Sequence, residues 1–117
     1  MTNATAATLT VLFVDDDIDA AELFTLLAGG RGHRVLHATS LAQGRSMLAE
    51  ADVLVTDVEL GDGSGLDLLS SGRPARLRRA YVVTGHAHLE KEAKRAGFDG
   101  SFTKPVDPDT LLLTLEV

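Results

Sequence analysis

Short apolar runs recur along the chain, and each is followed by a stretch in which apolar and polar residues alternate at helical spacing. The first run, at residues 9–14 (LTVLFV), is rich in β-branched residues and almost wholly apolar. Such a run predicts a strand buried on both faces, as in a parallel sheet. The same pattern predicts further strands at residues 33–38, 53–56, 81–84 and 101–103.

The amphipathic segments between these runs predict helices. Residues 18–28 carry apolar side chains at helical spacing, and the two glycines that follow would end this helix. Ser40 can cap the next helix, and Asp107 can cap a last one that starts at Pro108. The remaining predicted segments are helices at 41–50, 66–70 and 89–96 and a flexible loop at 61–65.

This alternation predicts an α/β fold, a single doubly wound five-stranded parallel sheet flanked by helices. The connections between strands should be right-handed. A chain of 117 residues suits one compact domain. In such sheets a ligand lies outside the carboxyl ends of the strands, where the strand order reverses. The polar residues at predicted strand ends are therefore the first place to look for chemistry.

Acidic residues and one lysine stand at those ends. Asp15, Asp16 and Asp17 close the first strand, Asp57 closes the third, and Lys104 follows the fifth. Two converging carboxylates about 4 Å apart repel by about 4 kcal/mol at an effective dielectric of ~20. A divalent cation and a lysine would neutralise such a cluster. These residue types in this pattern indicate a site that handles phosphoryl groups.

Four motifs stand in order along the chain, each at a strand end: VLFVDDD, VLVTD with the GDGSG loop after it, VVTG, and TKP. Together they resemble the receiver domain of two-component response regulators, over about residues 8–117. The resemblance implies the flavodoxin-like receiver fold. It divides the chain into a flexible N-terminal leader at 1–8 and a receiver domain at 9–117.

The resemblance also implies roles for the acidic residues. Asp57 would be the phosphoacceptor, since a carboxylate can attack a phosphoryl group to give an acyl phosphate. Mg²⁺ prefers hard oxygen ligands. Asp16 and Asp57 would bind it directly, Asp15 through water, and Glu59 through its backbone carbonyl. Asp17 is instead expected to cap the helix that follows it.

Two further polar residues belong to the implied site. Lys104 would reach the carboxylates and later a phosphoryl oxygen, and its bond to Pro105 would be cis, which costs little only before proline. Thr84 would donate its hydroxyl to the phosphoryl group. By similarity, Glu59 and His86 occupy the positions that tune the rate of self-hydrolysis. We expect the other histidines to be structural or solvated.

The implied partner is a sensor histidine kinase or a histidine phosphotransfer protein, which would supply the phosphoryl group from phosphohistidine. Phosphoryl transfer depends on positioning and charge neutralisation more than on covalent machinery. The expected protein is therefore a phosphorylation switch or phosphorelay station with slow self-dephosphorylation, and not a turnover enzyme.

The chain departs from the family pattern near its end. The family places an aromatic residue three positions before the lysine, where Ser101 stands here. Phe102 comes one residue later, which turns it to the other face of the strand, so it should pack in the core. The stretch from Thr84 to Gly97 is also short for the family, so the helix within it is expected to be trimmed or irregular.

These departures leave two alternatives open. One is an interaction module of receiver fold that works without phosphorylation. The other is a small phosphohydrolase with an aspartate nucleophile, which needs a second acid two residues further on. Glu59 has that spacing, although a glutamate is unusual there and the chain is short.

The composition of the chain limits which kinds of binding partner are expected. The net charge is −6, which argues against direct nucleic-acid binding, and the arginines between residues 73 and 79 are expected to be solvated. There is no cysteine, signal peptide or long apolar run, so we expect a cytoplasmic protein that has no membrane contact. The apolar face of the last helix (Leu111, Leu112, Leu115) is expected to be core, and any exposed part would support a homodimer.

Overall fold

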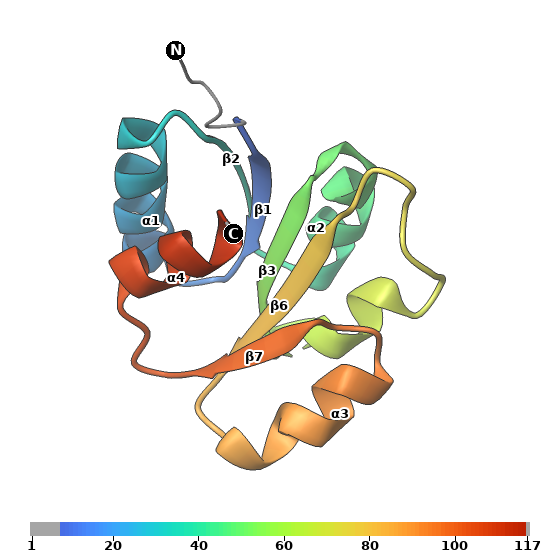
Figure 1. Ribbon diagram of the computed structural model, residues 1–117. Helices are drawn as coiled ribbons and strands as arrows, with labels where there is room; N and C mark the ends of the chain where they lie inside the picture. Colours follow the sequence, from blue (N-terminus) through green and yellow to red (C-terminus); the bar gives the residue numbers. More distant parts are fainter. Residues whose placement is uncertain (1–7, 117) are drawn as a thin grey trace.

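The computed structural model describes residues 8–116. Its centre is a five-stranded parallel sheet in the order β2-β1-β3-β6-β7 (Figure 1). The strands are β1 (Thr10–Val14), β2 (Arg34–Ala38), β3 (Val53–Asp57), β6 (Arg79–Thr84) and β7 (Gly100–Thr103). The prediction of a doubly wound α/β sheet is confirmed. The strand order reverses between β1 and β3, and the site is expected at that point.

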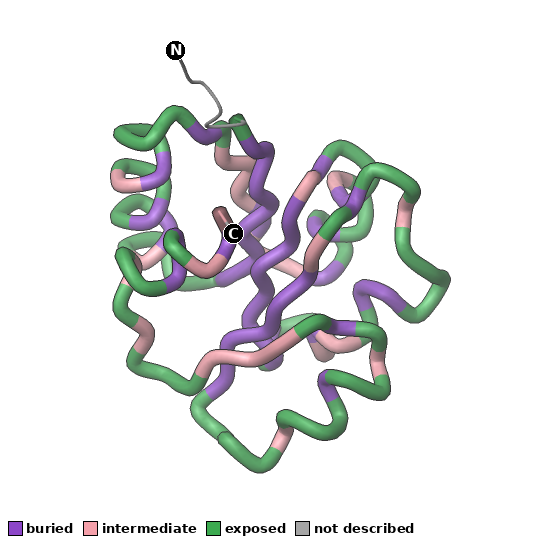
Figure 2. Tube along the Cα trace, in the orientation of Figure 1, coloured by how far each residue is buried: buried purple, intermediate pink, exposed green. Residues whose placement is uncertain are grey.

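Helices cover both faces of the sheet (Figure 1). On one face lie α1 (Ile18–Gly30) and α4 (Pro108–Leu115). On the other lie α2 (Leu41–Met47) and α3 (Glu90–Arg95) with three short 3₁₀ turns, η2 (Leu48–Glu50), η3 (Gly65–Leu69) and η4 (Ala87–Leu89). The apolar core is accordingly divided into two clusters, one on each face. In Figure 2 the central strands are almost wholly buried.

Three predicted caps start their helices as expected. The side chains of Asp17, Ser40 and Asp107 each accept a hydrogen bond from a backbone N–H in the first turn of α1, α2 and α4. Each satisfies one of the donors that a helix leaves unpaired at its start. Pro108 occupies the beginning of α4, as predicted.

Several helix boundaries differ from the prediction. α1 continues through both glycines, and the chain turns instead at Gly32, whose φ of +87° lies in the left-handed region. The predicted helix at 41–50 splits at Met47 into α2 and η2. The predicted helix at 66–70 is the 3₁₀ turn η3, and most of the predicted flexible loop is a hairpin of β4 (Glu59–Leu60) and β5 (Gly63–Ser64).

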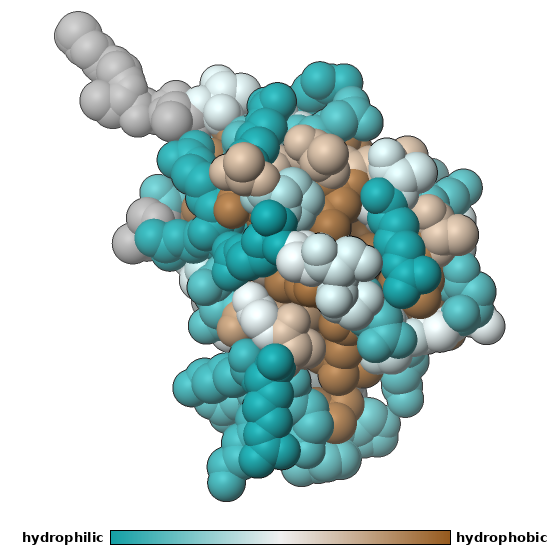
Figure 3. Space-filling view, turned by 90° about the vertical axis from the view of Figure 1, so that its right-hand side faces the viewer, coloured by the Kyte–Doolittle hydropathy of each residue, from teal (hydrophilic) through white to brown (hydrophobic). Residues whose placement is uncertain are grey.

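The face of α2, η3 and α3 is covered only by short elements. α3 has six residues, in line with the short helix expected there. Leu36, Met47, Leu66, Leu89 and Ala96 pack against the buried cluster but remain partly exposed. Figure 3, which looks onto this side, shows a band of apolar atoms between polar side chains.

Two of the arginines expected to be solvated are exposed, and they also form ion pairs that hold the loop before β6. Arg73 lies 3.1 Å from Asp99, and Arg76 lies 3.1 Å from Asp52. Asp52 in turn accepts a hydrogen bond of 2.8 Å from the backbone N–H of Thr10. These contacts lie at the amino ends of the strands, so they are structural and remote from the expected site.

A second polar cluster closes the same end of the sheet. The Glu116 carboxylate accepts hydrogen bonds from Arg31 and from Nε2 of His33, the latter at 2.6 Å. Nδ1 of His33 accepts the backbone N–H of Leu9 at 3.1 Å, so the ring hydrogen is on Nε2. The hydrogen bond from Arg31 is the main reason why the pKa of Glu116 falls to about 2, and His33 adds to the effect.

The apolar face of α4 is core, as expected. Leu111, Leu112 and Leu115 are all buried, while Leu113 on the opposite side is exposed. Every helix within residues 8–116 is too short or too polar to span a lipid bilayer. Residues 1–7 of the predicted leader lie outside the described residues.

Candidate functional site

Three carboxylates converge where the strand order reverses. Asp15 and Asp16 follow β1, Asp57 ends β3, and β1 and β3 are paired neighbours. One oxygen from each carboxylate lies within 4.8 Å of the other two. Asp15 and Asp57 are buried and Asp16 is exposed, so the cluster opens to solvent on one side. Such an all-oxygen set fits a hard divalent cation, and the acidic pocket could bind one.

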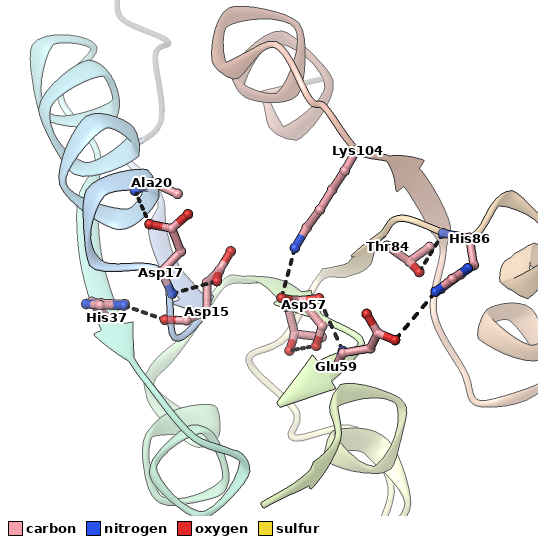
Figure 4. A network of polar contacts seen from close by, with 10 residues as sticks. Asp15, Asp17, Ala20, His37, Asp57, Glu59, Thr84, His86 and Lys104 are labelled. Carbon is pink, nitrogen blue, oxygen red and sulfur yellow. Dashed lines mark hydrogen bonds and ion pairs between the residues drawn. The ribbon is translucent and has the colours of Figure 1, made fainter. Parts of the chain in front are cut away.

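Lys104 points from the end of β7 toward this cluster (Figure 4). Its Nζ donates a hydrogen bond of 2.9 Å to Oδ2 of Asp57, and its backbone N–H donates to the carbonyl of Thr84 at 2.8 Å. Its peptide bond to Pro105 is cis, as expected. Partial burial lowers the pKa of Lys104, but the hydrogen bond and the charge of Asp57 raise it above its usual value overall.

The surroundings of Asp15 disfavour its negative charge. Burial disfavours its charged form and is the main reason why its pKa is raised, and the charge of Asp57 acts in the same direction. A hydrogen bond of 2.9 Å from the backbone N–H of Asp17 offsets part of this effect. A bound cation would relieve the same repulsion, so the donor set and its electrostatics both suit a metal ion.

Thr84 and Glu59 lie on the other side of Asp57 (Figure 4). Thr84 ends β6 and is buried, and its hydroxyl oxygen accepts the backbone N–H of His86 at 3.1 Å. The backbone N–H of Glu59 donates to Oδ1 of Asp57 at 3.2 Å. The side chain of Glu59 extends toward His86, whose Nε2 lies 3.5 Å from its carboxylate. The structure thus brings every predicted site residue to one edge of the sheet.

The loop after Asp57 is tightly held against the strand. A Cβ added to Gly65 would lie 2.0 Å from the backbone carbonyl oxygen of Asp57 and 2.7 Å from the hydroxyl of Thr56. The backbone N–H of Gly65 also donates to the carbonyl of Val58 at 2.8 Å. Only glycine fits here, so this residue fixes the path of the chain directly beneath the carboxylate.

Two residues that sequence reasoning did not assign to the site support it. Nε2 of His37, on β2, donates to the backbone carbonyl of Asp15 at 2.9 Å, which orients the acidic loop. The Asp62 carboxylate accepts the backbone N–H groups of Leu41 and Ala42 at 2.8 and 3.1 Å, so it ties the β4–β5 hairpin to the start of α2. Nothing local in the sequence signals either contact, because each partner is at least 20 residues away.

Phe102 packs as predicted. It is half-buried against the cluster beneath α1 and α4, and its ring meets that of Tyr81 edge-on with centroids 5.7 Å apart. Ser101 is the neighbouring residue in β7, so its side chain faces the opposite side of the sheet, toward α3.

A groove of about 530 Å³ adjoins the site between α1 and the chain leading into α4. Its walls are mainly apolar, from residues that include Phe13, Leu23, Phe24 and Leu111. Asp15 and Lys104 line it as well, so the groove is continuous with the acidic cluster.

Comparison with known proteins agrees with this geometry. Residues 11–116 match the family model of the response regulator receiver domain. The chain is 32% identical to the alginate biosynthesis transcriptional regulatory protein AlgB of Pseudomonas putida over 108 residues, 88% of this chain. It spans about a quarter (24%) of the length of that relative. An uncharacterized 14.6 kDa protein of Leptolyngbya boryana is also 32% identical, with 92% of this chain and 88% of the relative covered.

Solved structures show the same fold. A CheY-like receiver domain protein from Methanospirillum hungatei superposes with a TM-score of 0.80 at 28% identity, covering 93% of this chain and 91% of that one. CheY4 of Vibrio cholerae gives a TM-score of 0.79 at 26% identity, with 93% and 97% covered. The chain belongs to the response regulator receiver domain family.

Proposed function

We propose that this domain is a Mg²⁺-dependent phosphorylation switch or relay station in which Asp57 accepts a phosphoryl group from a phosphohistidine. One observation carries this proposal. The buried Asp57 carboxylate contacts Lys104 at 2.9 Å while it shares a cluster of three carboxylates whose oxygens lie within 4.8 Å. The proposed nucleophile Asp57, the Lys104 ammonium group and the carboxylates that could bind a metal ion thus lie together.

The transfer step follows from these groups. A carboxylate oxygen of Asp57 attacks phosphorus, the P–N bond breaks, and the imidazole of the donor leaves with that electron pair. Asp15, Asp16, Asp57 and the backbone carbonyl of Glu59 would hold Mg²⁺, which supplies charge neutralisation for the phosphoryl oxygens when bound. Lys104 would move from Asp57 to a phosphoryl oxygen.

Thr84 would complete the phosphorylated state. Its hydroxyl accepts one hydrogen bond from the His86 backbone and still has a proton to donate. Donation to a phosphoryl oxygen would turn this side chain toward Asp57 and draw the start of the following loop with it. That movement is our proposed structural response to phosphorylation.

The proposed partner is a sensor histidine kinase or a histidine phosphotransfer protein. Delivery of a phosphoryl group to a buried carboxylate requires the donor to cover the opening of the site. The apolar groove beside α1 begins at that opening, and Leu23 on its rim is 49% exposed. We infer that part of the donor protein lies in this groove, and that small phosphodonors do not need it.

A phosphorylation-independent interaction module is the second candidate function. Ser101 in place of the aromatic residue and the six-residue α3 favour it, because both lie in the region that would report phosphorylation. The phosphohydrolase alternative has less support. The Glu59 side chain is 71% exposed and directed toward His86, so it is not held against Asp57 as a general acid would be.

Intact mass after incubation with acetyl phosphate or phosphoramidate and Mg²⁺ tests the proposal. The parent should gain one phosphoryl group, and Asp57→Asn or removal of Mg²⁺ should abolish the gain. No adduct, together with no Mg²⁺ binding, would favour the interaction module. Steady release of phosphate from a phosphomonoester would instead favour the hydrolase.

A further inference from the structure

The β4–β5 hairpin connects the candidate site to α2, and its base contacts Asp57. The backbone N–H of Glu59 donates to Oδ1 of Asp57 at 3.2 Å, while Lys104 holds Oδ2 from the other side (Figure 4). The backbone N–H of Gly65 closes the base by donating to the carbonyl of Val58 at 2.8 Å. The position of Glu59 in the hairpin therefore helps to set how the Asp57 carboxylate is turned.

The tip of the same hairpin is held against the start of α2. Oδ1 and Oδ2 of Asp62 accept the backbone N–H groups of Leu41 and Ala42 at 2.8 and 3.1 Å, so both carboxylate oxygens are used. A Cβ added to Gly63, whose φ is +151°, would lie only 2.8 Å from a methyl carbon of Leu41. The backbone of the tip thus lies closely against the first residue of α2.

α2 has a cap of its own, so the contact from Asp62 is additional. The Ser40 hydroxyl accepts the backbone N–H of Gln43 at 3.1 Å, which is the usual reach of an N-cap side chain. Asp62 instead comes from 20 and 21 residues away in the sequence to the two N–H groups that precede Gln43. The hydrogen bond from Leu41 is the main reason why the pKa of Asp62 is lowered. Of the two acceptors at this helix end, Asp62 is the one that belongs to the hairpin.

We propose that Asp62 is a positioning residue for the candidate site, which holds the β4–β5 hairpin where the backbone of Glu59 can orient Asp57 and bind Mg²⁺. The inference rests on the proposed function, in which the Glu59 carbonyl is a ligand of that ion. Asp62 acts only through the hairpin, since its own carboxylate is bonded to α2. A hairpin free to move would have to be ordered when the ion binds, and that cost lowers affinity.

The coupling must act in both directions. If the bonds between Asp62 and α2 favour Mg²⁺ binding, bound Mg²⁺ must favour those bonds by the same factor. Mg²⁺ should therefore slow hydrogen exchange at the backbone N–H groups of Leu41 and Ala42, although α2 supplies no ligand. The start of α2 would thus respond to the state of the site by a route that uses neither Ser101 nor α3.

Calorimetric titration with Mg²⁺ tests the proposal in the parent and in three variants. Asp62→Ala should weaken Mg²⁺ binding about 10-fold, the lower end of what loss of a supporting group costs a metal site. Asp62→Asn keeps one oxygen that can accept these hydrogen bonds, so it should lose less affinity. Ser40→Ala is the matched control, because it removes a cap from the same helix end without touching the hairpin, and it should bind Mg²⁺ as the parent does.

Two further readouts separate positioning from stability. In the metal-free domain, hydrogen exchange at the Glu59 N–H, followed by NMR, should be faster in Asp62→Ala and unchanged in Ser40→Ala. Labelling of Asp57 by acetyl phosphate should need about 10-fold more Mg²⁺ in Asp62→Ala, with a maximal rate close to that of the parent, because saturating Mg²⁺ restores the hairpin.

Equal Mg²⁺ affinity in Asp62→Ala and the parent would overturn the proposal. An equal loss in Ser40→Ala would overturn it too, because the stability of α2 alone would then explain the effect. If Asp62→Ala does not fold, Asp62→Asn carries the same comparisons. If the parent binds no Mg²⁺, the proposed function fails, and Glu59 exchange decides whether Asp62 holds the hairpin: faster exchange in the variant supports that role, and unchanged exchange removes it.

Discussion

Lys104 Nζ lies 2.9 Å from Oδ2 of Asp57, so the ends of β7 and β3 are joined across β6, which separates them in the sheet. The contact holds a positive charge against a buried carboxylate whose other neighbours are acidic. Lys104 is thus the one cation that the described side chains place in hydrogen-bond contact with Asp57. Its removal should expose how much the site depends on charge balance.

Lys104→Ala should slow labelling of Asp57 by acetyl phosphate about 100-fold, the scale at which loss of one preorganised donor to a developing charge lowers rates. The rate of mass gain in saturating Mg²⁺ measures this. Lys94→Ala, which removes an exposed lysine of α3, is the matched control and should label at the parent rate. Equal rates for both variants would exclude the proposed role of Lys104.

Mg²⁺ should stabilise the folded domain, because it binds a carboxylate cluster that exists only when β1 and β3 are paired. An ion present at 100 times its Kd adds about 2.7 kcal/mol to the free energy of unfolding. The thermal midpoint should therefore rise with Mg²⁺ and return on chelation. Asp16→Asn should remove most of this dependence, whereas Asp19→Asn on the exposed side of α1 should retain it.

The pair of Glu59 and His86 should set the lifetime of the acyl phosphate. The two side chains meet at 3.5 Å beside Asp57, and an exposed pair of this kind is worth about 0.2–1 kcal/mol. Replacing them with Asn and Ala opens the path for water, so hydrolysis should quicken by up to about fivefold. Loss of labelled mass over time, measured without transition metals, gives the rate. An unchanged rate would refute the tuning role of the pair.

Gly65→Ala should damage both stability and the site. The added Cβ would meet the backbone carbonyl of Asp57 at 2.0 Å, a contact that backbone movement alone can relieve. Overpacking of this kind costs about 1–3 kcal/mol. Urea unfolding should show the loss, together with weaker Mg²⁺ binding. Gly61→Ala is the control, since a Cβ there has no neighbour within 4 Å.

Glu116 should stabilise the fold in a pH-dependent way. Its pKa falls from 4.5 to about 2 on folding, so its contribution is complete above pH 4.5 and is lost as the pH falls toward 2. Because Arg31 is exposed to solvent, we expect Glu116→Gln to cost only about 1 kcal/mol at pH 7. The free energies of unfolding of parent and variant, measured with urea, should converge as the pH drops through this range. A difference that persists at low pH would contradict the assignment.

The sequence was sufficient to predict the sheet and the residues at its carboxyl edge. Parallel strands buried on both faces leave an unmistakable apolar pattern, and acids at their ends must converge once the strands pair. The sequence alone therefore indicates that Asp15, Asp57 and Lys104 lie close together. The caps at Asp17 and Ser40 were equally predictable because they are local.

Contacts between distant segments could not be predicted. α1 continues through two glycines, and the residue with left-handed backbone is Gly32, just before the chain enters β2. Asp62 reaches the start of α2 only because the loop after Asp57 folds back as a hairpin. Arg73 and Arg76 are exposed as expected, but their ion pairs could not be predicted because the acidic partners, Asp99 and Asp52, lie far away in sequence.

The cluster of Arg31, His33 and Glu116 has a mechanical consequence. It connects the last described turn to the start of β2, at the end of the sheet opposite Asp57. The backbone N–H of Leu9 also donates a hydrogen bond to His33 in this cluster. These contacts join segments from both ends of the described chain, whereas the end of the sheet that carries Asp57 has, among the described side chains, only the Lys104–Asp57 contact between its site loops and β7. We therefore expect a deformation that begins at Asp57 to be expressed at the same end of the sheet, in the hairpin and the turns beside β6 and β7.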